Sequence, residues 1–529
     1  MVSTGAPDFL WSKHIGQIGG TDFGESIVVD NSGNIYLSGE FQSAVIDLGG
    51  IFLTNRGASD VFLAKYERGG NLVWAKQIGG SKWDRAARLA LGPGGDIYIT
   101  ASFLSSEISL GSTVFTNNGM WDFFVARLDG DGEPIWITQG IGADSDQIDA
   151  IAVDAAGNCF VAGYSDGPTV NYGGTILTNR GSLDQSTTSK MDTFFAKYSP
   201  DGLLEWVQQF GSYTYPPYLG IAADAGGNCY LAGSFLGKGT FGSTNLQALA
   251  SLDIFVAKYA PDGAVQWARR AGGLGTDADY AKNGNYVRCL KLDREGNLYM
   301  AGTFHSPVVE FDSFSLTNAG RQNAYLAKLA PDNSVLWATG IYSSSKVITV
   351  CIDIDSKGNC YSASTFSSPT LQLGDYVMTN SSSDWHNDMF LSKYDPDGNL
   401  NYLRQTKGDL DENANAIWTD IAGNCYITGA FSSNDLQLGN TNYNAGGSFN
   451  IFVAKLDTTI QPSLAYDRKG DAMFLSWSQL FGGYELQMSG NASGSNWAPF
   501  KGNIAQANGT NAAEIPIDLP PALFRLARP

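Results

Sequence analysis

Three segments of this sequence combine aromatic, carboxylate and amide side chains, the residue types that stack on sugars or anchor a protein partner. They are YTYPPY at 213–218, LGTDADYAKNGNY at 274–286 and SSSDWHND at 381–388. Adding comparable segments gives the following candidate ligand-binding residues: Trp83, Asp84, Asp144, Asp146, Tyr213, Tyr215, Tyr218, Asp277, Asp279, Tyr280, Trp385, His386 and Asp411. They predict recognition of a glycan or a protein. The alternative is a solvated loop surface whose aromatic rings cap the elements beneath.

Pairs of acids in the same segments suggest a second function. Asp277 and Asp279 could serve a glycosidase, which places two carboxyl groups about 5 to 9.5 Å apart across a sugar bond. Acids are so frequent in these segments that such pairs are expected by chance. The three histidines stand in unrelated places, and the H-E-x-x-H, G-x-S-x-G and phosphate-binding glycine motifs are missing. A carbohydrate-active enzyme, hydrolase or lyase, is therefore the second hypothesis, after a non-enzymatic binding or scaffold protein. A purely structural surface-layer role, which would need no site, is the third.

Two short acidic segments could bind calcium, a hard cation that prefers oxygen ligands. They are DGDGEP at 129–134 and DPDGN at 395–399, and the weak candidate ligands are Asp129, Asp131, Asp395 and Asp397. Neither segment continues into a full ligand loop, and turn formation alone explains Asp and Gly at these places. We expect no cofactor, with calcium as the alternative.

Composition narrows the class of protein. Among 529 residues, 63 are glycines, 12% are aromatic and only 16% are charged, which indicates short strands and tight turns. The formal charge of −19 disfavours nucleic acid and anionic lipid as partners. No apolar run is long enough for a membrane helix, and the first residues lack the features of a signal peptide. The protein is therefore either cytosolic or exported with a leader that is absent from this chain. The low lysine content, the acidic balance and the abundant Asn, Gly, Ser and Thr favour export, and we expect a monomer.

A repeat of 62 to 70 residues organises the chain. Its Gly-Asn or Gly-Asp turns place an equivalent residue at Asn34, Asp96, Asn158, Asn228, Asn297, Asn359 and Asn424. Each repeat reads as four strands, for example SIVVD, NIYLSGEF, DVFLAKY and LVWAKQIG. Four antiparallel strands in a unit of this size predict one blade of an all-β, seven-bladed propeller.

The two ends of the repeat region complement each other. The seventh repeat supplies three strands and no fourth, whereas FLWSKHIG at residues 9–16 is a fourth strand with no others before it. The N-terminal strand is therefore expected to complete the last blade and close the ring. This gives a propeller at residues 1–458.

The repeat resembles a known family. The motifs WAKQIGG, VDxxGNxYxxGxF, LTNxG and DxFxAKY are similar to the SBBP, or seven-bladed β-propeller, repeat of bacterial proteins, over roughly residues 9–457. The resemblance implies a propeller and, frequently, a secreted or surface-attached bacterial protein, without a defined activity. The six cysteines recur at equivalent repeat positions, which predicts buried free thiols.

Residues 461–529 break the repeat. The segments AMFLSWSQ, YELQMSG, NWAPF and ALFRLAR alternate like strands of a small β-sandwich-like module. They resemble the C-terminal modules ending in FFRL on exported proteins of some environmental bacteria, although Leu523 replaces the first Phe.

Strand alternation places the candidates on one face. The connections between the second and third strands, and between one blade and the next, share the face with the long loops, and repeat features that vary are better functional candidates than features that recur. An enzyme should concentrate buried acids of raised pKa at the channel mouth, whereas a binding protein should expose an aromatic patch.

Overall fold

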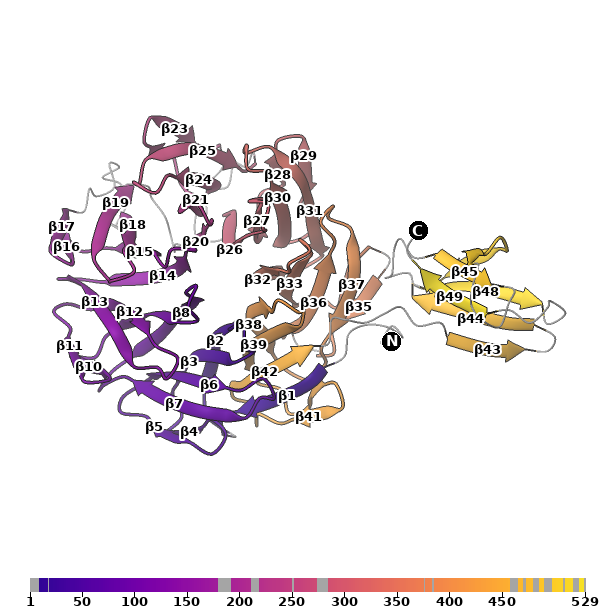
Figure 1. Ribbon diagram of the computed structural model, residues 1–529, viewed down its shortest axis with the longest axis horizontal. Helices are drawn as coiled ribbons and strands as arrows, with labels where there is room; N and C mark the ends of the chain where they lie inside the picture. Colours follow the sequence, from indigo (N-terminus) through magenta and orange to yellow (C-terminus); the bar gives the residue numbers. More distant parts are fainter. Residues whose placement is uncertain are drawn as a thin grey trace.

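The computed structural model is an all-β chain (Figure 1). The residues that it describes are 9–17, 19–178, 192–210, 218–249, 252–273, 284–374, 376–382, 385–456, 465–469, 472–478, 485–489, 497–507, 510–516 and 523–527.

Within these residues, seven antiparallel four-stranded units form a ring. Their innermost strands are β2 (Asp22–Val29), β8 (Asp84–Leu91), β14 (Asp146–Val153), β20 (Gly220–Ala223), β26 (Tyr286–Leu292), β32 (Val347–Ile354) and β38 (Glu412–Thr419). The second strands are β3 (Ile35–Phe41), β9 (Ile97–Phe103), β15 (Cys159–Ser165), β21 (Cys229–Phe235), β27 (Leu298–Phe304), β33 (Cys360–Phe366) and β39 (Cys425–Phe431). Each innermost strand contacts its counterpart in the next unit, and β38 contacts β2.

The outer half of each unit comes from the second hairpin of the repeat. The third strands are β6 (Asp60–Tyr66), β12 (Asp122–Leu128), β18 (Asp192–Tyr198), β24 (Asp253–Tyr259), β30 (Asn323–Leu329), β36 (Asp388–Tyr394) and β42 (Asn450–Leu456). The outermost strands are β7 (Leu72–Ile78), β13 (Pro134–Gly142), β19 (Leu204–Phe210), β25 (Val265–Ala271), β31 (Val335–Ser343), β37 (Leu400–Gln405) and β1 (Phe9–Ile15). The strand predicted at residues 9–16 is β1, and it pairs antiparallel with β42 of the last repeat.

Contacts between neighbouring blades explain why certain residues recur in every repeat. The third strands are buried along nearly their whole length, because both faces pack against adjacent blades. The indole Nε1 of Trp136 donates a hydrogen bond to the carbonyl of Pro200, in the turn of the next blade, at 2.8 Å. In that turn, Gly202 has a φ of +81°, and an added Cβ would lie 2.6 Å from the Trp136 ring. The Asp-Gly turn is therefore a packing surface for the preceding tryptophan.

The connection between the second and third strands is an ordered hairpin in every repeat. These hairpins pair β4 (Val45–Asp47) with β5 (Phe52–Thr54), β10 (Glu107–Leu110) with β11 (Thr113–Thr116), β16 (Thr169–Tyr172) with β17 (Thr175–Thr178), β22 (Lys238–Phe241) with β23 (Thr244–Gln247), β28 (Val308–Phe311) with β29 (Phe314–Thr317), β34 (Thr370–Leu373) with β35 (Tyr376–Thr379), and β40 (Leu436–Leu438) with β41 (Thr441–Tyr443). Strand β16 extends the sheet of the preceding blade by pairing with β13. Much of each connection expected to form a variable loop is therefore part of the scaffold.

The C-terminal strands form two small antiparallel sheets of their own. One contains β43 (Ala465–Lys469), β44 (Ala472–Ser478), β48 (Thr510–Pro516) and β47 (Ile504–Ala507); the other contains β46 (Ala498–Pro499), β45 (Glu485–Ser489) and β49 (Leu523–Ala527). Leu475, Leu486, Ala513 and Ile515 form their shared core.

Candidate functional site

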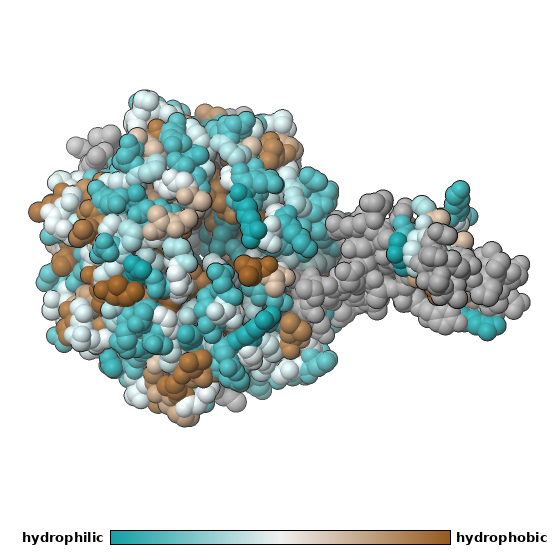
Figure 2. All heavy atoms as spheres, viewed as in Figure 1, coloured by the Kyte–Doolittle hydropathy of each residue, from teal (hydrophilic) through white to brown (hydrophobic). Residues whose placement is uncertain are grey.

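A cavity of about 440 Å³ occupies the middle of the ring. Residues from all seven innermost strands line it, and Figure 2 shows the corresponding hollow at the centre of the ring. Its volume lies within the range of about 300 to 1,000 Å³ that is usual for small-molecule sites. The cavity is therefore the best-formed candidate site in the part of the chain that the structure describes.

Irregularities in the innermost strands carry polar side chains into this cavity. Five of these strands have a one-residue bulge at the same repeat position, which adds an unpaired residue. The added residues are Glu25, Asp149, Arg288, Val350 and Asn415. The corresponding register shift in β8 spans residues 87 and 88, and Arg88 lines the cavity. Thus one backbone feature recurs while the side chain that it presents varies.

Arg88 and Asp149 lie on one side of the cavity, and Glu25 lies beside Arg88. Arg88 Nη1 donates a hydrogen bond to the Glu25 carbonyl at 2.8 Å and lies 3.9 Å from the Glu25 carboxylate. Burial raises the pKa of Asp149 to about 7, although Arg88 opposes the shift. Burial likewise raises the pKa of Glu25 and, together with Glu25 itself, raises the pKa of Glu40 to about 7. Burial therefore makes the protonated form of Asp149 and Glu40 more stable than it is in an exposed carboxyl group.

The opposite wall carries a guanidinium without a carboxylate partner. Arg288 Cζ lies 3.7 Å from the centroid of the Tyr218 ring. Its Nε is buried and has no hydrogen-bond partner, and no ion pair within the described ranges includes Arg288. Burial, followed by the neighbouring guanidinium groups of Arg288 and Arg321, lowers the pKa of Lys346. Arg288 lines this side of the cavity, and Arg321 and Lys346 add positive charge near it, although the chain as a whole is acidic.

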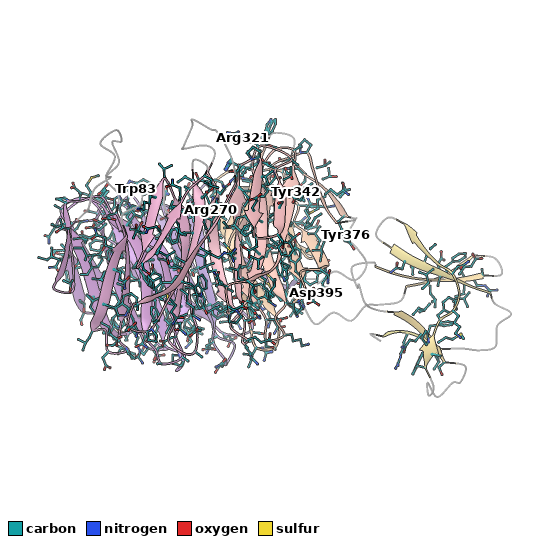
Figure 3. The ribbon with its side chains drawn as sticks, turned by 90° about the horizontal axis from the view of Figure 1, so that it is seen from above. Trp83, Arg270, Arg321, Tyr342, Tyr376 and Asp395 are labelled. Atoms are coloured by element: carbon teal, nitrogen blue, oxygen red, sulfur yellow. The ribbon has the colours of Figure 1, made fainter. Side chains whose placement is uncertain are left out.

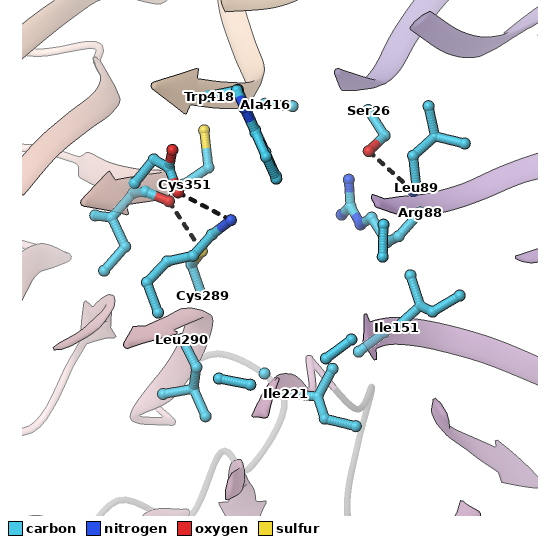
Figure 4. A pocket seen from close by; sticks show the side chains of 18 of the residues that line it. Ser26, Arg88, Leu89, Ile151, Ile221, Cys289, Leu290, Cys351, Ala416 and Trp418 are labelled. Atoms are coloured by element: carbon cyan, nitrogen blue, oxygen red, sulfur yellow. Dashed lines mark hydrogen bonds and ion pairs between the residues drawn. The ribbon is translucent and has the colours of Figure 1, made fainter. Parts of the chain in front are cut away.

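A third group closes the wall between β26, β32 and β38. Lys291 Nζ lies 3.0 Å from Asp353 Oδ1 and 4.8 Å from the centroid of the Trp418 ring. Asp353 Oδ2 also accepts hydrogen bonds from the backbone N–H and the hydroxyl of Thr419, at 2.6 and 2.7 Å. Burial lowers the pKa of Lys291, but Asp353 together with Cys289 and Cys351 outweighs burial, so the pKa is raised. Figure 4 shows Trp418, Cys289 and Cys351 across the open space from Arg88.

The predicted aromatic residues that the structure describes are at least partly exposed. Trp385 is 74% exposed and has a φ of +68°, whereas Trp83 and Tyr218 are each 38% exposed. Figure 3 is a side view of the ring in which Trp83 and Arg321 lie toward one face and Asp395 lies toward the other. Among these predicted residues, Tyr218 also contacts the cavity residue Arg288. Tyr213, Tyr215, Asp277, Asp279 and Tyr280 lie outside the described residues.

The predicted acids separate into two kinds. Asp144 is exposed, whereas Asp84 and Asp146 are buried at the start of their strands. Asp84 accepts hydrogen bonds from the backbone and hydroxyl of Ser105, and the same arrangement joins Asp22 to Ser43 in the first repeat. Because this acid recurs at one repeat position, it fixes the inner hairpin and is not available to a ligand there.

The structure brings together two other predicted residues. His386 Nδ1 lies 2.8 Å from Asp411 Oδ2, and the other carboxylate oxygen of Asp411 accepts the backbone N–H of Asn387 at 2.9 Å. This pair ties a connection within the sixth repeat to the segment that leads into the seventh. It positions the exposed Trp385 at the rim.

The calcium candidates serve as turn residues. Asp129 Oδ1 accepts the backbone N–H groups of Asp131 and Glu133, each at 2.9 Å. Asp395 Oδ1 does the same for Asp397 and Asn399, at 3.0 and 2.9 Å. Across the described residues, no group of three or more His, Cys, Asp or Glu side chains is placed to hold a metal ion.

Sequence reasoning missed the bulge residues Glu25, Asp149, Arg288 and Asn415. Their signal is present in the aligned repeats, because a charged or amide residue stands among the small and apolar residues of a buried strand. The sequence-based candidates were chosen from the variable loops and not from the innermost strands. A comparison of the repeats at the innermost strand would have found it.

The matches with known proteins agree with this architecture. Residues 10–40 match the family model SBBP, a β-propeller repeat, which confirms the resemblance noted in the sequence. The chain is a β-propeller repeat protein.

Two curated relatives and one solved structure illustrate the similarity. The WD repeat-containing protein L264 of Acanthamoeba polyphaga mimivirus is 21% identical over an alignment of 482 residues that covers 76% of this chain and 34% of that protein. The regulatory protein FlaEY of Caulobacter vibrioides is 24% identical over 33% of this chain and 18% of its own length. This chain therefore spans about a third or less of these relatives. Acylaminoacyl peptidase of Pyrococcus horikoshii gives a TM-score of 0.38 at 9% identity, over 86% of this chain and 57% of the peptidase.

The described part of the chain contains no helix with the length and apolar character needed to cross a bilayer.

Proposed function

We propose that this protein binds a saccharide in the central cavity of its propeller. The observation that carries the proposal is the set of bulges, which direct Asp149, Arg288 and Asn415 from separate strands into one cavity. Carboxyl, guanidinium and amide groups match the donors and acceptors of sugar hydroxyls, and the rings of Trp418 and Tyr218 offer apolar faces beside them. An extracellular location, expected from the composition, would suit such a ligand.

A binding screen tests the proposal. Mono-, di- and trisaccharides are titrated by calorimetry against the protein and against Asp149→Asn and Asn415→Ala. Both variants should weaken binding by at least about tenfold, since each removes a hydrogen bond inside a desolvated site. Trp385→Ala, at the exposed rim, is the matched control and should bind as the parent does. Loss of binding on Trp385→Ala with no effect in the cavity would place the ligand on the rim instead.

Acid–base hydrolysis is the second candidate function. It is favoured by the pKa of about 7 for Asp149, which lines the cavity, because a general acid must hold its proton near the working pH. The same saccharides are assayed for release of reducing ends. An enzyme would release product, and Asp149→Asn would abolish release while binding persists. Binding without release in the parent protein would leave the non-enzymatic function.

A further inference from the structure

We infer that the saccharide bound in the cavity carries a carboxylate, as in a hexuronic acid, and that Arg288 is the residue that recognises it. This inference rests on the saccharide-binding function proposed above. It concerns one wall of the cavity, where the arrangement of Arg288 and Tyr218 leaves a specific bonding geometry open.

The orientation of the Arg288 guanidinium is fixed by Tyr218. With Cζ 3.7 Å from the ring centroid, one face of the guanidinium is covered by the aromatic ring. Hydrogen bonds can therefore be made only through the edge of the group. An arginine edge presents parallel N–H groups whose spacing matches the two oxygens of a carboxylate.

Among the described residues, the Nε at that edge has no protein acceptor. The Nε of Arg288 is buried and lacks a hydrogen-bond acceptor, and Arg288 makes no ion pair among the residues described. A buried cation without a partner is destabilising, and a bound anion would offset this cost. Arg321 and Lys346 are cationic and lie near Arg288, so they strengthen the attraction, although Asp411 acts on Lys346 in the opposite direction.

The acids in and beside the cavity interact with groups other than Arg288. Asp353 is held by Lys291 and Thr419, at 2.6 to 3.0 Å. Glu25 and Asp149 lie on the side of Arg88, which lowers the pKa of each against the effect of burial. The cavity thus separates a carboxylate-binding wall from a wall suited to hydroxyl groups. An acidic sugar has both kinds of group on one ring.

The test compares an acidic saccharide with its uncharged methyl ester. Trigalacturonic acid and its methyl ester are titrated against the full chain, Arg288→Gln, Arg288→Lys and Arg294→Gln, the last being an exposed arginine of the turn between β26 and β27. The parent protein and Arg294→Gln should prefer the acid by at least about tenfold. Arg288→Gln should lose this preference while it still binds the ester. Arg288→Lys keeps the positive charge but lacks the two parallel N–H groups, so it should retain only part of the preference.

Three results would overturn the inference. Equal affinity of the parent for acid and ester would show that no carboxylate is recognised, while the proposed saccharide binding would stand. A preference that survives Arg288→Gln, with an unchanged melting temperature, would assign recognition to another residue. Failure of the parent to bind any saccharide would remove the proposed function together with this inference.

Discussion

The guanidinium of Arg288 lies against the ring of Tyr218 at 3.7 Å, although the two residues belong to neighbouring repeats. Tyr218 precedes β20, and Arg288 is the bulge residue of β26. The contact therefore sets the position of a cavity residue from the adjacent blade.

Replacement of Tyr218 should affect ligand affinity more than stability. Tyr218→Ala removes the ring that holds the guanidinium and should weaken trigalacturonic acid binding by about 3- to 30-fold, in line with cation–π energies. Tyr218→Phe keeps the ring and should bind nearly as the parent does. Calorimetry provides the affinities, and urea unfolding shows whether stability changes. Equal losses for Ala and Phe would mean that the hydroxyl, and not the ring, is responsible.

The Lys291–Asp353 pair predicts a non-additive effect on stability. Asp353→Asn leaves the amine of Lys291 without its carboxylate partner, and it should lower the free energy of unfolding by about 3 kcal/mol. Lys291→Met in the same chain removes the unpaired charge and should restore much of the loss. A double-mutant cycle by urea unfolding measures the coupling. Additive effects of the two changes would contradict the pairing seen at 3.0 Å.

Buried carboxyl groups make stability depend on pH in a defined direction. Burial raises the pKa of Asp146 from 3.8 to about 7, and that of Glu412 from 4.5 to about 9. Between these limits the folded protein holds more protons than the unfolded chain, so the free energy of unfolding falls as pH rises from about 4 to 9. Asp146→Asn should flatten the lower part of this range. Urea unfolding at several pH values checks it, and greater stability at high pH would refute it.

The tryptophans of the outermost strands should stabilise the ring. Trp337 is 8% exposed, and its Nε1 donates to the carbonyl of Pro396 in the next blade at 3.0 Å. Trp337→Phe should cost about 1 kcal/mol for the hydrogen bond, and Trp337→Ala about 3 to 5 kcal/mol with the lost packing. Trp385→Ala, a change at an exposed rim residue, should stay within about 0.5 kcal/mol. Thermal and urea unfolding of the three variants distinguish these roles.

The six free cysteines should differ in reactivity. Five are buried and Cys289 is partly exposed on the cavity wall, while burial raises the pKa of its thiol. A chromogenic disulfide reagent should label Cys289 first and slowly in the native protein, and label all six after denaturation. Cys289→Ser should remove the early phase. An early phase that persists in this variant would show that another thiol is accessible.

Much of the fold could be predicted from the sequence because the same four-stranded pattern occurs in seven repeats. The Phe-x-Ala pattern of the third strand and the tryptophan of the fourth recur at fixed positions, and a recurring residue reports a recurring contact, as Trp136 and Trp337 show. The complementary ends of the repeat region likewise predicted the partner of β1.

The cavity could not be predicted in the same way. A bulge is a property of the paired backbone, and a single strand such as β26 gives no sign that Arg288 is the unpaired residue. Asp84 and Asp146 were predicted to bind a ligand but are buried, for a related reason. From the sequence, a buried acid at the start of a strand cannot be distinguished from an exposed acid in a loop until its serine partner is known. Residues that were expected to form variable loops also belong to ordered hairpins, such as β16 with β17.

A crystal structure of the full chain with trigalacturonic acid would test the central claim most directly. We predict a sugar in the ring cavity, with its carboxylate on the edge of Arg288 and its hydroxyl groups toward Asp149 and Asn415. Density on the rim at Trp385 or on the C-terminal sheets, with the cavity free of sugar, would contradict the account.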